Sequence, residues 1–209
     1  AKSAKHIAFI MDGNRRWAKA CGTASSMGHV AGYEKMKEVA FWVKEAQIPN
    51  AIIYALSTEN WKRDPEEVAH LLSLFRLLIT EFLAERAEGK HVGTRIRFVG
   101  DRAPFPEDLQ NSMQGLEEVT AYETERTLAI AVSYGGRAEI LTATQRLIKD
   151  GVQADDVTEE RFAQALWTAG IPDPDLIIHT GGAQRLSNFL PWQSTYSELF
   201  FVKTYWPDF

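Results

Sequence analysis

Apolar and polar positions alternate along this chain in two different patterns. The first pattern consists of short apolar runs with the length of buried strands, at residues 7–11, 51–56, 95–99, 128–132 and 176–178. Between these runs, apolar residues recur three and four positions apart, as on one face of a helix, for example at Met36, Val39, Ala40 and Val43. Strands that alternate with helices indicate a parallel sheet. We therefore predict one α/β domain over residues 1–209, with a mostly parallel central sheet flanked by helices.

The longest helical pattern spans residues 65–87. It carries a broad apolar stripe made of Val68, Leu71, Leu72, Phe75, Leu78, Ile79 and Phe82. Such a stripe forms ordinary core in most helices, and it can also form one wall of an apolar tunnel. Both structures need the same side chains, so the stripe alone leaves the two interpretations open.

A polar motif, residues 12–17, follows the first predicted strand: Asp12, Gly13, Asn14, Arg15, Arg16 and Trp17. The turn from a strand into a helix is where α/β proteins bind phosphate. Backbone N–H groups, a glycine that permits close approach and two guanidinium groups suit a diphosphate. Asp12 can hold the Mg²⁺ that bridges its oxygens, although this residue could also simply cap the next helix. The motif therefore points to diphosphate chemistry.

Three further polar segments follow predicted strands or open predicted helices. His29, between Gly28 and Gly32, could donate to a phosphate oxygen or satisfy the backbone. The segment 57–63 follows the second strand and could bind a ligand or cap a helix. Near the end of the chain, Arg185 and Ser187 offer a guanidinium and a hydroxyl to a second anion, with a surface salt bridge as the alternative for Arg185.

Composition limits the classes of partner. The chain has 23 Lys and Arg against 28 Asp and Glu, a net charge of −5, so a general nucleic-acid-binding surface is excluded and the arginines near the motifs act locally. Cys21 is the single cysteine, which fits a reducing compartment, so we expect a cytoplasmic protein. Because no apolar run reaches the roughly 20 residues needed to cross a bilayer, we expect no integral membrane segment.

These motifs, taken in their order, resemble those of the cis-prenyltransferases, the undecaprenyl diphosphate synthase-like family. The resemblance rests on residues 6–19, 28–32, 57–61, 134–137 and 185–198, and thus spans nearly the whole chain. It implies a homodimer of α/β subunits, each with an apolar substrate cleft between sheet and helices. The implied reaction joins an allylic prenyl diphosphate to a second C5 prenyl diphosphate, and Mg²⁺ assists the departure of the leaving diphosphate.

The resemblance also assigns roles to single residues. Asp12 would be the metal-linked catalytic carboxylate, and Glu198 would complete the metal environment. The allylic diphosphate would be held by residues of the first motifs, namely Gly13, Asn14, Arg15, Arg16, Trp17 and His29. Asn60 and Trp61 would lie beside the reacting carbons. The acceptor diphosphate would be bound by Arg185, Ser187 and His179, and a catalytic role falls on Asn60, Ser187 and Asn188.

The chain departs from the family pattern at both anion sites. Ser25 stands where the family usually has arginine, and His179 and Ala183 replace an arginine and a glutamate near the second site. Two reactions fit these changes. One is regular head-to-tail elongation with isopentenyl diphosphate to a Z-configured product. The other, which we favour, is irregular coupling of two dimethylallyl diphosphates, as in the lavandulyl and cyclolavandulyl diphosphate synthases of this fold. A third alternative is a non-catalytic partner subunit.

Overall fold

A six-stranded sheet forms the centre of the protein, whose structure, a computed structural model, describes residues 4–209. The strand order is β3-β4-β2-β1-β5-β6, and every pairing between these strands is parallel. The strands are β1 (His6–Ile10), β2 (Asn50–Tyr54), β3 (Thr94–Val99), β4 (Arg126–Ala131), β5 (Leu176–His179) and β6 (Glu198–Phe201). The predicted α/β class and central parallel sheet are therefore confirmed.

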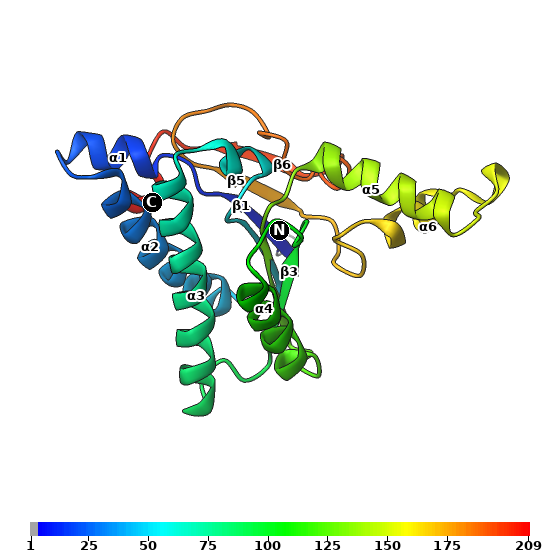
Figure 1. Ribbon diagram of the computed structural model, residues 1–209, viewed down its shortest axis with the longest axis horizontal. Coiled ribbons are helices and arrows are strands. Elements are labelled where there is room, and N and C mark those ends of the chain that lie inside the picture. Colours follow the sequence, from blue (N-terminus) through cyan, green and yellow to red (C-terminus); the bar gives the residue numbers. More distant parts are fainter. Residues whose placement is uncertain (1–3) are drawn as a thin grey trace.

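Helices cover both sides of the sheet (Figure 1). They are α1 (Asn14–Ala20), α2 (Ser25–Glu45), α3 (Pro65–Ala87), α4 (Glu107–Thr120), α5 (Gly136–Lys149) and α6 (Glu159–Ala165). In Figure 1, α2 and α3 stand side by side on one side of the sheet, whereas α5 and α6 extend away from it on the other. Because both faces are covered, all five residues of β1 are buried, which explains why this strand has a continuous apolar run.

The two faces of the sheet carry different cores. On one face, side chains such as Phe9 and Ile53 pack against Tyr33, Met36 and Val39 of α2. Farther along the same face, α3 and α4 pack on β3 and β4. The other face presents the small residues Ala8, Ala129 and Ala131, which leave room for the aromatic rings of Tyr54, Tyr134 and Phe189. Most of the apolar stripe predicted for residues 65–87 packs in the core that α3 and α4 form with β3 and β4.

Helix α3 has the bounds that the sequence predicts. The carboxylate of Asp64 accepts a hydrogen bond from the backbone N–H of Glu66, and Pro65 occupies the first turn, where its missing N–H is not needed. Helix α2 begins at Ser25, three residues before the motif that was expected to open it. A Cβ on Gly28 would lie 2.1 Å from the carbonyl oxygen of Asn14, so this glycine allows α1 and α2 to touch.

The sixth strand, β6, was not predicted. It is only four residues long, and Glu198, Leu199 and Phe200 are exposed. Within residues 4–209 it pairs with β5 alone, so it forms an edge of the sheet. A short, exposed edge strand lacks the buried apolar run that reveals the inner strands.

All strands of a parallel sheet end on the same side, and the loops at this carboxyl end carry the polar motifs. The loops after β1, β2 and β5 carry Asp12, Asn60 and Arg185, which lie far apart in the sequence. Ligands of open parallel sheets bind at this position. In the part of the chain that the structure describes, no helix is both long and apolar enough to span a bilayer.

His6 makes the stability of the fold depend on pH. It is buried at the start of β1, its Nδ1 donates to the carbonyl of Pro172 (2.5 Å), and burial lowers its pKa below the ordinary value of 6.5. As the pH falls through this value, the unfolded chain binds a proton that the folded chain resists, so the free energy of unfolding decreases. We expect urea unfolding to show lower stability at about pH 5.5 than at pH 7, and a smaller difference in His6→Asn. An equal pH dependence in both proteins would contradict this assignment.

Candidate active site

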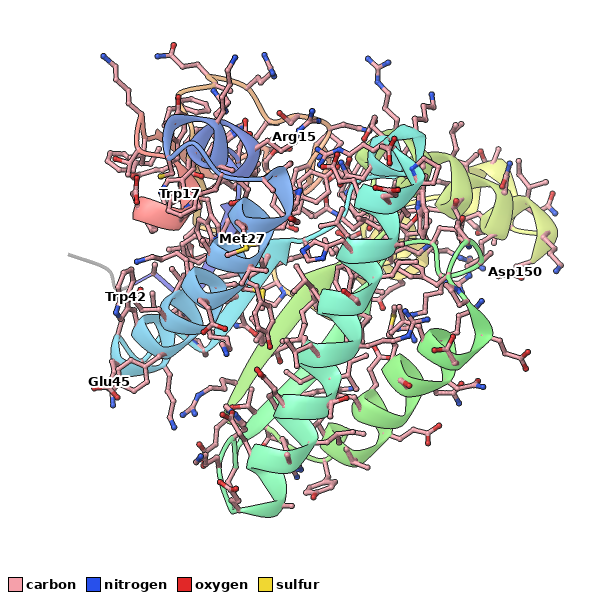
Figure 2. The ribbon with its side chains drawn as sticks, turned by 60° about the vertical axis from the view of Figure 1, so that its left-hand side comes forward. Arg15, Trp17, Met27, Trp42, Glu45 and Asp150 are labelled. Atoms are coloured by element: carbon pink, nitrogen blue, oxygen red, sulfur yellow. The ribbon has the colours of Figure 1, made fainter. Side chains whose placement is uncertain are left out.

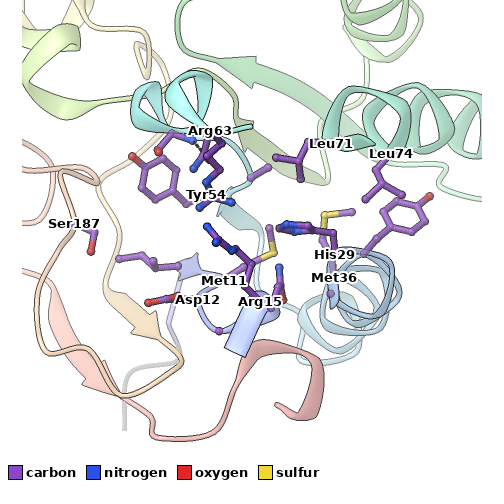
Figure 3. Close-up of a pocket in the computed structure, with 18 of the residues that line it drawn as sticks. Met11, Asp12, Arg15, His29, Met36, Tyr54, Arg63, Leu71, Leu74 and Ser187 are labelled. Carbon is purple, nitrogen blue, oxygen red and sulfur yellow. Dashed lines mark hydrogen bonds between the residues drawn. The ribbon is translucent and has the colours of Figure 1, made fainter. Parts of the chain in front are cut away.

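A cavity of about 1070 Å³ opens at the carboxyl edge of the sheet. His29 and Met36 of α2 face Leu71 and Leu74 of α3 across it, while Asp12 and Ser187 lie at its other end (Figure 3). The lining is charged and polar around the strand ends. Between α2 and α3 it is mainly apolar, with Met36, Leu71, Leu74, Phe75 and Leu78. The cavity therefore has a polar end and an apolar end.

The turn after β1 fixes Asp12 at the polar end. Its backbone N–H donates to the hydroxyl oxygen of Thr180 (3.1 Å), and its carbonyl accepts from the Thr180 hydroxyl (2.8 Å) and from the N–H of Trp206 (3.0 Å). The next residue, Gly13, has φ 113°, and a Cβ there would lie 2.7 Å from the ring of Tyr205. The motif therefore needs glycine at this position both for its backbone conformation and for the close packing of Tyr205.

The carboxylate of Asp12 lies between two basic side chains. Its Oδ2 is 3.1 Å from Nη2 of Arg16 and 3.6 Å from Nε2 of His179. Burial acts to raise the pKa of Asp12, but the contacts with His179 and Arg16 outweigh burial and hold this pKa below its ordinary value. Arg16 also donates to the carbonyl of Gly181 (2.8 Å). Asp12 is therefore a fixed, ionised carboxylate at neutral pH.

His179 connects the two predicted anion sites. Its ring is 1% exposed, and its Nδ1 donates to the carbonyl of Arg185 (2.6 Å). Among the described residues, its Nε2 has no hydrogen-bond partner and faces Asp12 at the longer distance given above. One nitrogen is thus used for the Arg185 backbone and the other faces the first site. A buried ring held in this way offers the second anion less than an arginine would.

A second polar group lies where α2 and α3 approach each other. Glu67 accepts hydrogen bonds from Nε2 of His29 (3.0 Å) and Nη1 of Arg63 (2.7 Å), and Arg15 lies 3.9 Å away. Burial would raise the pKa of Glu67, but these partners hold it below its ordinary value. Burial lowers the pKa of His29 in spite of Glu67. The carboxylate orients His29 and Arg63 at the cavity; the Nε2–H of His29 is used for Glu67, whereas the remaining N–H groups of Arg63 suit an anionic ligand.

The loop after β2 places Asn60 on the cavity and turns Trp61 away from it. The side-chain oxygen of Asn60 accepts from the backbone N–H of Ser57 (2.8 Å), which holds the short 3₁₀ helix Thr58–Lys62 in position. The indole of Trp61 donates to the hydroxyl of Ser133 (2.9 Å) and packs edge-on against Phe105, with ring centroids 5.0 Å apart. Trp61 therefore supports the loop from behind.

The segment with Ser187 and Asn188 has a strained backbone. Both residues are in the left-handed region, with φ of 51° and 62°. The start of α5 holds this conformation, because the N–H of Gly136 donates to the Asn188 carbonyl (2.8 Å) and the N–H of Arg137 to its side-chain oxygen (3.0 Å). Strain of this kind persists where the surroundings over-determine the backbone, and it occurs often at functional sites. Here it presents Ser187 and Arg185 to the cavity.

Most of the residues predicted for the site line this one cavity, namely Asp12, Gly13, Asn14, Arg15, Arg16, His29, Asn60, His179, Arg185, Ser187 and Asn188. Trp17 and Trp61 are not among its lining residues. The indole of Trp17 donates to Asp208 (2.8 Å), and Figure 2 shows Trp17 beside the C-terminal segment. Both indoles thus make contacts within the protein, and their expected roles toward substrate stay predictions.

The structure does not bring Glu198 to Asp12. Glu198 pairs in register with Leu176 at the amino end of β5, whereas Asp12 follows Ile10, which pairs with His179 at the carboxyl end. Asp12 thus lies at the carboxyl end of the strands and Glu198 at their amino end, and the two residues are two strands apart. At about 3.3 Å per strand residue and 4.8 Å between strands, the two carboxylates of one chain are too far apart to share a metal ion.

Glu67 and Tyr33 were not predicted as site residues, and Arg63 was included only as the last residue of the segment 57–63. Arg63 and Glu67 are four positions apart at the start of α3, a spacing that brings side chains together on one helix face. That pairing was visible in the sequence. Their contact with His29, 38 positions away from Glu67, requires the tertiary structure.

Asp12 fits a magnesium ion that is shared with a bound diphosphate. Among residues 4–209, no group of three or more His, Cys, Asp or Glu side chains could hold a metal ion. Mg²⁺ is commonly bound by one or two carboxylates together with substrate phosphates. One ionised carboxylate beside cationic side chains therefore suits a Mg²⁺–diphosphate ligand, and Arg15 and Arg16, which line the same cavity, would bind its remaining phosphate oxygens.

The chain is similar to known proteins over nearly its whole length. A family model described as putative undecaprenyl diphosphate synthase matches residues 10–209. An isoprenyl transferase from Agrobacterium fabrum is 43% identical over 98% of this chain and 83% of its own length. The matched region contains every polar segment described above.

Two solved structures are similar in fold. The lavandulyl diphosphate synthase of Lavandula x intermedia, in complex with dimethylallyl diphosphate, has a TM-score of 0.92 and 31% identity over 99% of this chain and 90% of that one. A probable undecaprenyl diphosphate synthase from Campylobacter jejuni has a TM-score of 0.81 and 31% identity over 100% and 90%. From the site, the fold and the matched family model together, the chain belongs to the undecaprenyl diphosphate synthase family of prenyltransferases, the cis-prenyltransferases.

Proposed function

We propose that this protein is a Mg²⁺-dependent prenyl diphosphate synthase that couples two dimethylallyl diphosphates head to middle into a branched or cyclic C10 diphosphate. The observation that carries the proposal is the lining of the large cavity, which joins an ionised carboxylate and several cations to an apolar region. A prenyl diphosphate has the matching chemistry, an anionic head on an apolar tail. Similarity to a lavandulyl diphosphate synthase gives further support.

The donor diphosphate binds at the Asp12 end. Gly13, Asn14, Arg15, Arg16 and His29 line this region, in which Arg15 and Arg16 supply N–H donors and positive charge. Asp12 would hold the Mg²⁺, which when bound supplies a Lewis acid for the leaving diphosphate. Fixed cations stabilise the charge that develops on this group as its bond to carbon breaks. Arg16 can exchange its contact with Asp12 for one with the diphosphate.

The proposed coupling needs no reagent other than the two dimethylallyl diphosphates. The bond between C1 of the donor and its diphosphate oxygen breaks, and its electron pair leaves with the diphosphate. The double bond of the acceptor forms the new carbon–carbon bond, and the resulting cation loses a proton directly or after ring closure. The acceptor keeps its own diphosphate, which Arg185 and Ser187 would bind. Asn60, on the opposite loop, would lie beside the reacting carbons.

Two substitutions favour the irregular reaction. Ser25 lines the cavity in the first turn of α2, where family members usually supply a guanidinium. His179 is buried and uses its Nδ1 for the carbonyl of Arg185. Both anion sites therefore hold one cation fewer than the family pattern, while the groups that ionise an allylic diphosphate remain. We infer that the protein takes a different acceptor diphosphate but still ionises the allylic donor.

Regular elongation with isopentenyl diphosphate is the second candidate. It is supported by the Campylobacter jejuni structure, whose protein is described as a probable undecaprenyl diphosphate synthase. In this reaction, the same Arg185 and Ser187 would bind isopentenyl diphosphate. The two candidates differ in the acceptor and share the donor site.

Incubation of the purified protein with dimethylallyl diphosphate and Mg²⁺ as the only additions tests the proposal. We expect a branched or cyclic C10 diphosphate, identified by mass spectrometry and NMR after dephosphorylation, because the donor apparatus is intact and no isopentenyl diphosphate is present. A linear Z-prenol that forms only after isopentenyl diphosphate is added would establish regular elongation instead. Absence of turnover with both substrates would favour the non-catalytic partner subunit.

We further propose a cytoplasmic homodimer without nucleic-acid partners. The edge strand β6 exposes Leu199 (44%) and Phe200 (58%), and the preceding Tyr196 is 96% exposed. A second copy would cover this apolar edge. The exposed thiol of Cys21 fits a reducing compartment. Light scattering of the purified protein measures the oligomeric state, and Phe200→Glu should shift it toward the monomer.

A further inference from the structure

His179 lies at the end of β5, beside the Asp12 turn. It pairs in register with Ile10, the last residue of β1, and the next residue, Thr180, holds the Asp12 backbone through the two hydrogen bonds described above. The ring of His179 also lies near the ring of Phe201 on β6, with centroids 6.2 Å apart. The sheet therefore fixes the positions of His179 and Asp12 relative to each other.

The hydrogen bond at Nδ1 of His179 determines which ring nitrogen carries a lone pair. The carbonyl oxygen of Arg185 can only accept, so Nδ1 carries the hydrogen in this contact. In the neutral ring, Nε2 is then an acceptor, and it faces another acceptor, Oδ2 of Asp12, at 3.6 Å. Within the described chain, this buried nitrogen has no hydrogen-bond partner. A cation or a proton between the two acceptors would satisfy both of them.

The surroundings of the His179 ring are those of a metal ligand. Histidines that bind a metal almost always donate their other ring N–H to a carboxylate, a backbone carbonyl or water, as Nδ1 of His179 does to Arg185. His179 and Asp12 both line the cavity, so an ion can reach them from the diphosphate site. Bonds from a divalent metal to such ligands are about 2.1 Å long, so two atoms less than about 4.2 Å apart can bind one ion. The separation of 3.6 Å is within this limit.

We propose that Nε2 of His179 is a second protein ligand, beside Asp12, of the divalent metal ion in the active site. The inference rests on the proposed function, because it concerns the metal that Asp12 would hold for the donor diphosphate. Mg²⁺ prefers oxygen ligands, whereas neutral imidazole suits transition metals such as Co²⁺ and Zn²⁺. A site with one carboxylate and one imidazole therefore binds these metals more tightly than Mg²⁺. An arginine at position 179, as in the family pattern, has no lone pair to offer a metal.

Pulsed EPR of bound Mn²⁺ tests the ligand directly and requires no turnover. The parent protein is loaded with substoichiometric Mn²⁺ and inorganic diphosphate, and the modulation of the electron spin echo detects nitrogen bound to the metal. We expect the coupling of a directly bound imidazole nitrogen, and this coupling should change when the protein contains ¹⁵N-labelled histidine. A folded parent protein that binds Mn²⁺ without nitrogen coupling would refute the proposal. The proximity of His179 to Asp12 would then be that of an ion pair.

Two variants identify the histidine. His179→Asn keeps an N–H group for the carbonyl of Arg185 and removes Nε2, so the nitrogen coupling should disappear. Calorimetry with inorganic diphosphate present should show the Kd of Co²⁺ rising by about tenfold or more, because even the loss of an outer partner weakens metal binding by about 10- to 100-fold. The Kd of Mg²⁺ should change by less than about threefold, since its oxygen ligands remain. His29→Gln is the matched control, because His29 lines the same cavity but uses Nε2 for Glu67, and it should keep the nitrogen coupling.

Asp12→Asn distinguishes a failure of this inference from a failure of the proposed function. If Mn²⁺ binds equally well to this variant and to the parent, Asp12 holds no metal, and both proposals are wrong on this point. If Mn²⁺ binding requires Asp12 but the ratio of the Co²⁺ and Mg²⁺ Kd values is the same in His179→Asn and the parent, only the role of His179 is wrong. Loss of the nitrogen coupling in His29→Gln together with its retention in His179→Asn would assign the ligand to His29 and likewise overturn the inference.

Discussion

Replacement of Asp12 by alanine should lower kcat by about a thousandfold and change the Kd for dimethylallyl diphosphate by less than about tenfold. The carboxylate is ionised and half-exposed at the cavity, and it is the group best placed to carry Mg²⁺ to the leaving diphosphate. We expect the arginines, which remain in the variant, to supply most of the ground-state binding. The loss therefore falls mainly on the transition state.

Two measurements separate these contributions. Single-turnover kinetics gives the rate of the chemical step, and calorimetry with a non-ionising thio analogue of the diphosphate gives binding. Asp12→Asn is the matched control, because it keeps the shape of the side chain and removes its charge, and it should lose nearly as much rate. The contacts that hold the turn use the Asp12 backbone, so the melting temperature should change little. A variant that retains the parent kcat would refute the metal role of Asp12.

The largest expected change in stability comes from Glu139. This carboxylate on α5 is 1% exposed and accepts hydrogen bonds from the hydroxyl of Tyr134, from Nε2 of Gln193 (3.0 Å), and from the backbone N–H (3.1 Å) and hydroxyl (3.2 Å) of Thr168. Glu139→Ala leaves the donors of Tyr134 and Thr168 without this acceptor and opens a cavity, whereas Nε2 of Gln193 keeps its bond to the hydroxyl oxygen of Thr168 (2.8 Å). We expect the free energy of unfolding in urea to fall by about 4 kcal/mol.

Substitution of an exposed residue on the same helix provides the comparison. Gln145→Ala should change stability by less than about 0.5 kcal/mol, because this side chain faces solvent. Glu139→Gln should lie between the two, since the amide keeps one acceptor oxygen and turns an NH₂ group toward the remaining donors. A loss below about 1 kcal/mol in Glu139→Ala would mean that water or rearranged side chains replace the missing carboxylate.

The sequence predicted those parts of the fold that depend on local pattern. The inner strands carry continuous apolar runs because they are buried on both faces, and α3 begins at a capping Asp64 followed by Pro65. The edge strand β6 escaped detection because it is short and its residues are exposed. Local patterns report burial, so an unburied strand leaves little trace.

The sequence likewise predicted only part of the candidate site. The motifs pointed to Asp12, Asn60 and Arg185, because residues that follow parallel strands gather at the carboxyl end of a sheet. The orientation of individual side chains could not be predicted. Trp61 turns to Ser133, and Trp17 turns to Asp208, through partners 72 and 191 positions away. The contact between Tyr33 and Glu81 was hidden for the same reason, since these residues are 48 positions apart and belong to two helices whose contact no sequence spacing reveals.

The close packing of the segment around Tyr205 and Trp206 against the Asp12 turn bears on how the protein is made. The groups that hold the Asp12–Trp17 stretch are synthesised long after it, since Trp17 and its partner Asp208 are separated by 191 positions. At a synthesis rate of about 5 to 20 residues per second, roughly 10 to 40 seconds pass between the synthesis of the turn and that of these groups. During translation the residues of β1 and the arginines of α1 therefore emerge without these supports, and we expect the anion site to become ordered only after the segment around Tyr205 and Trp206 docks.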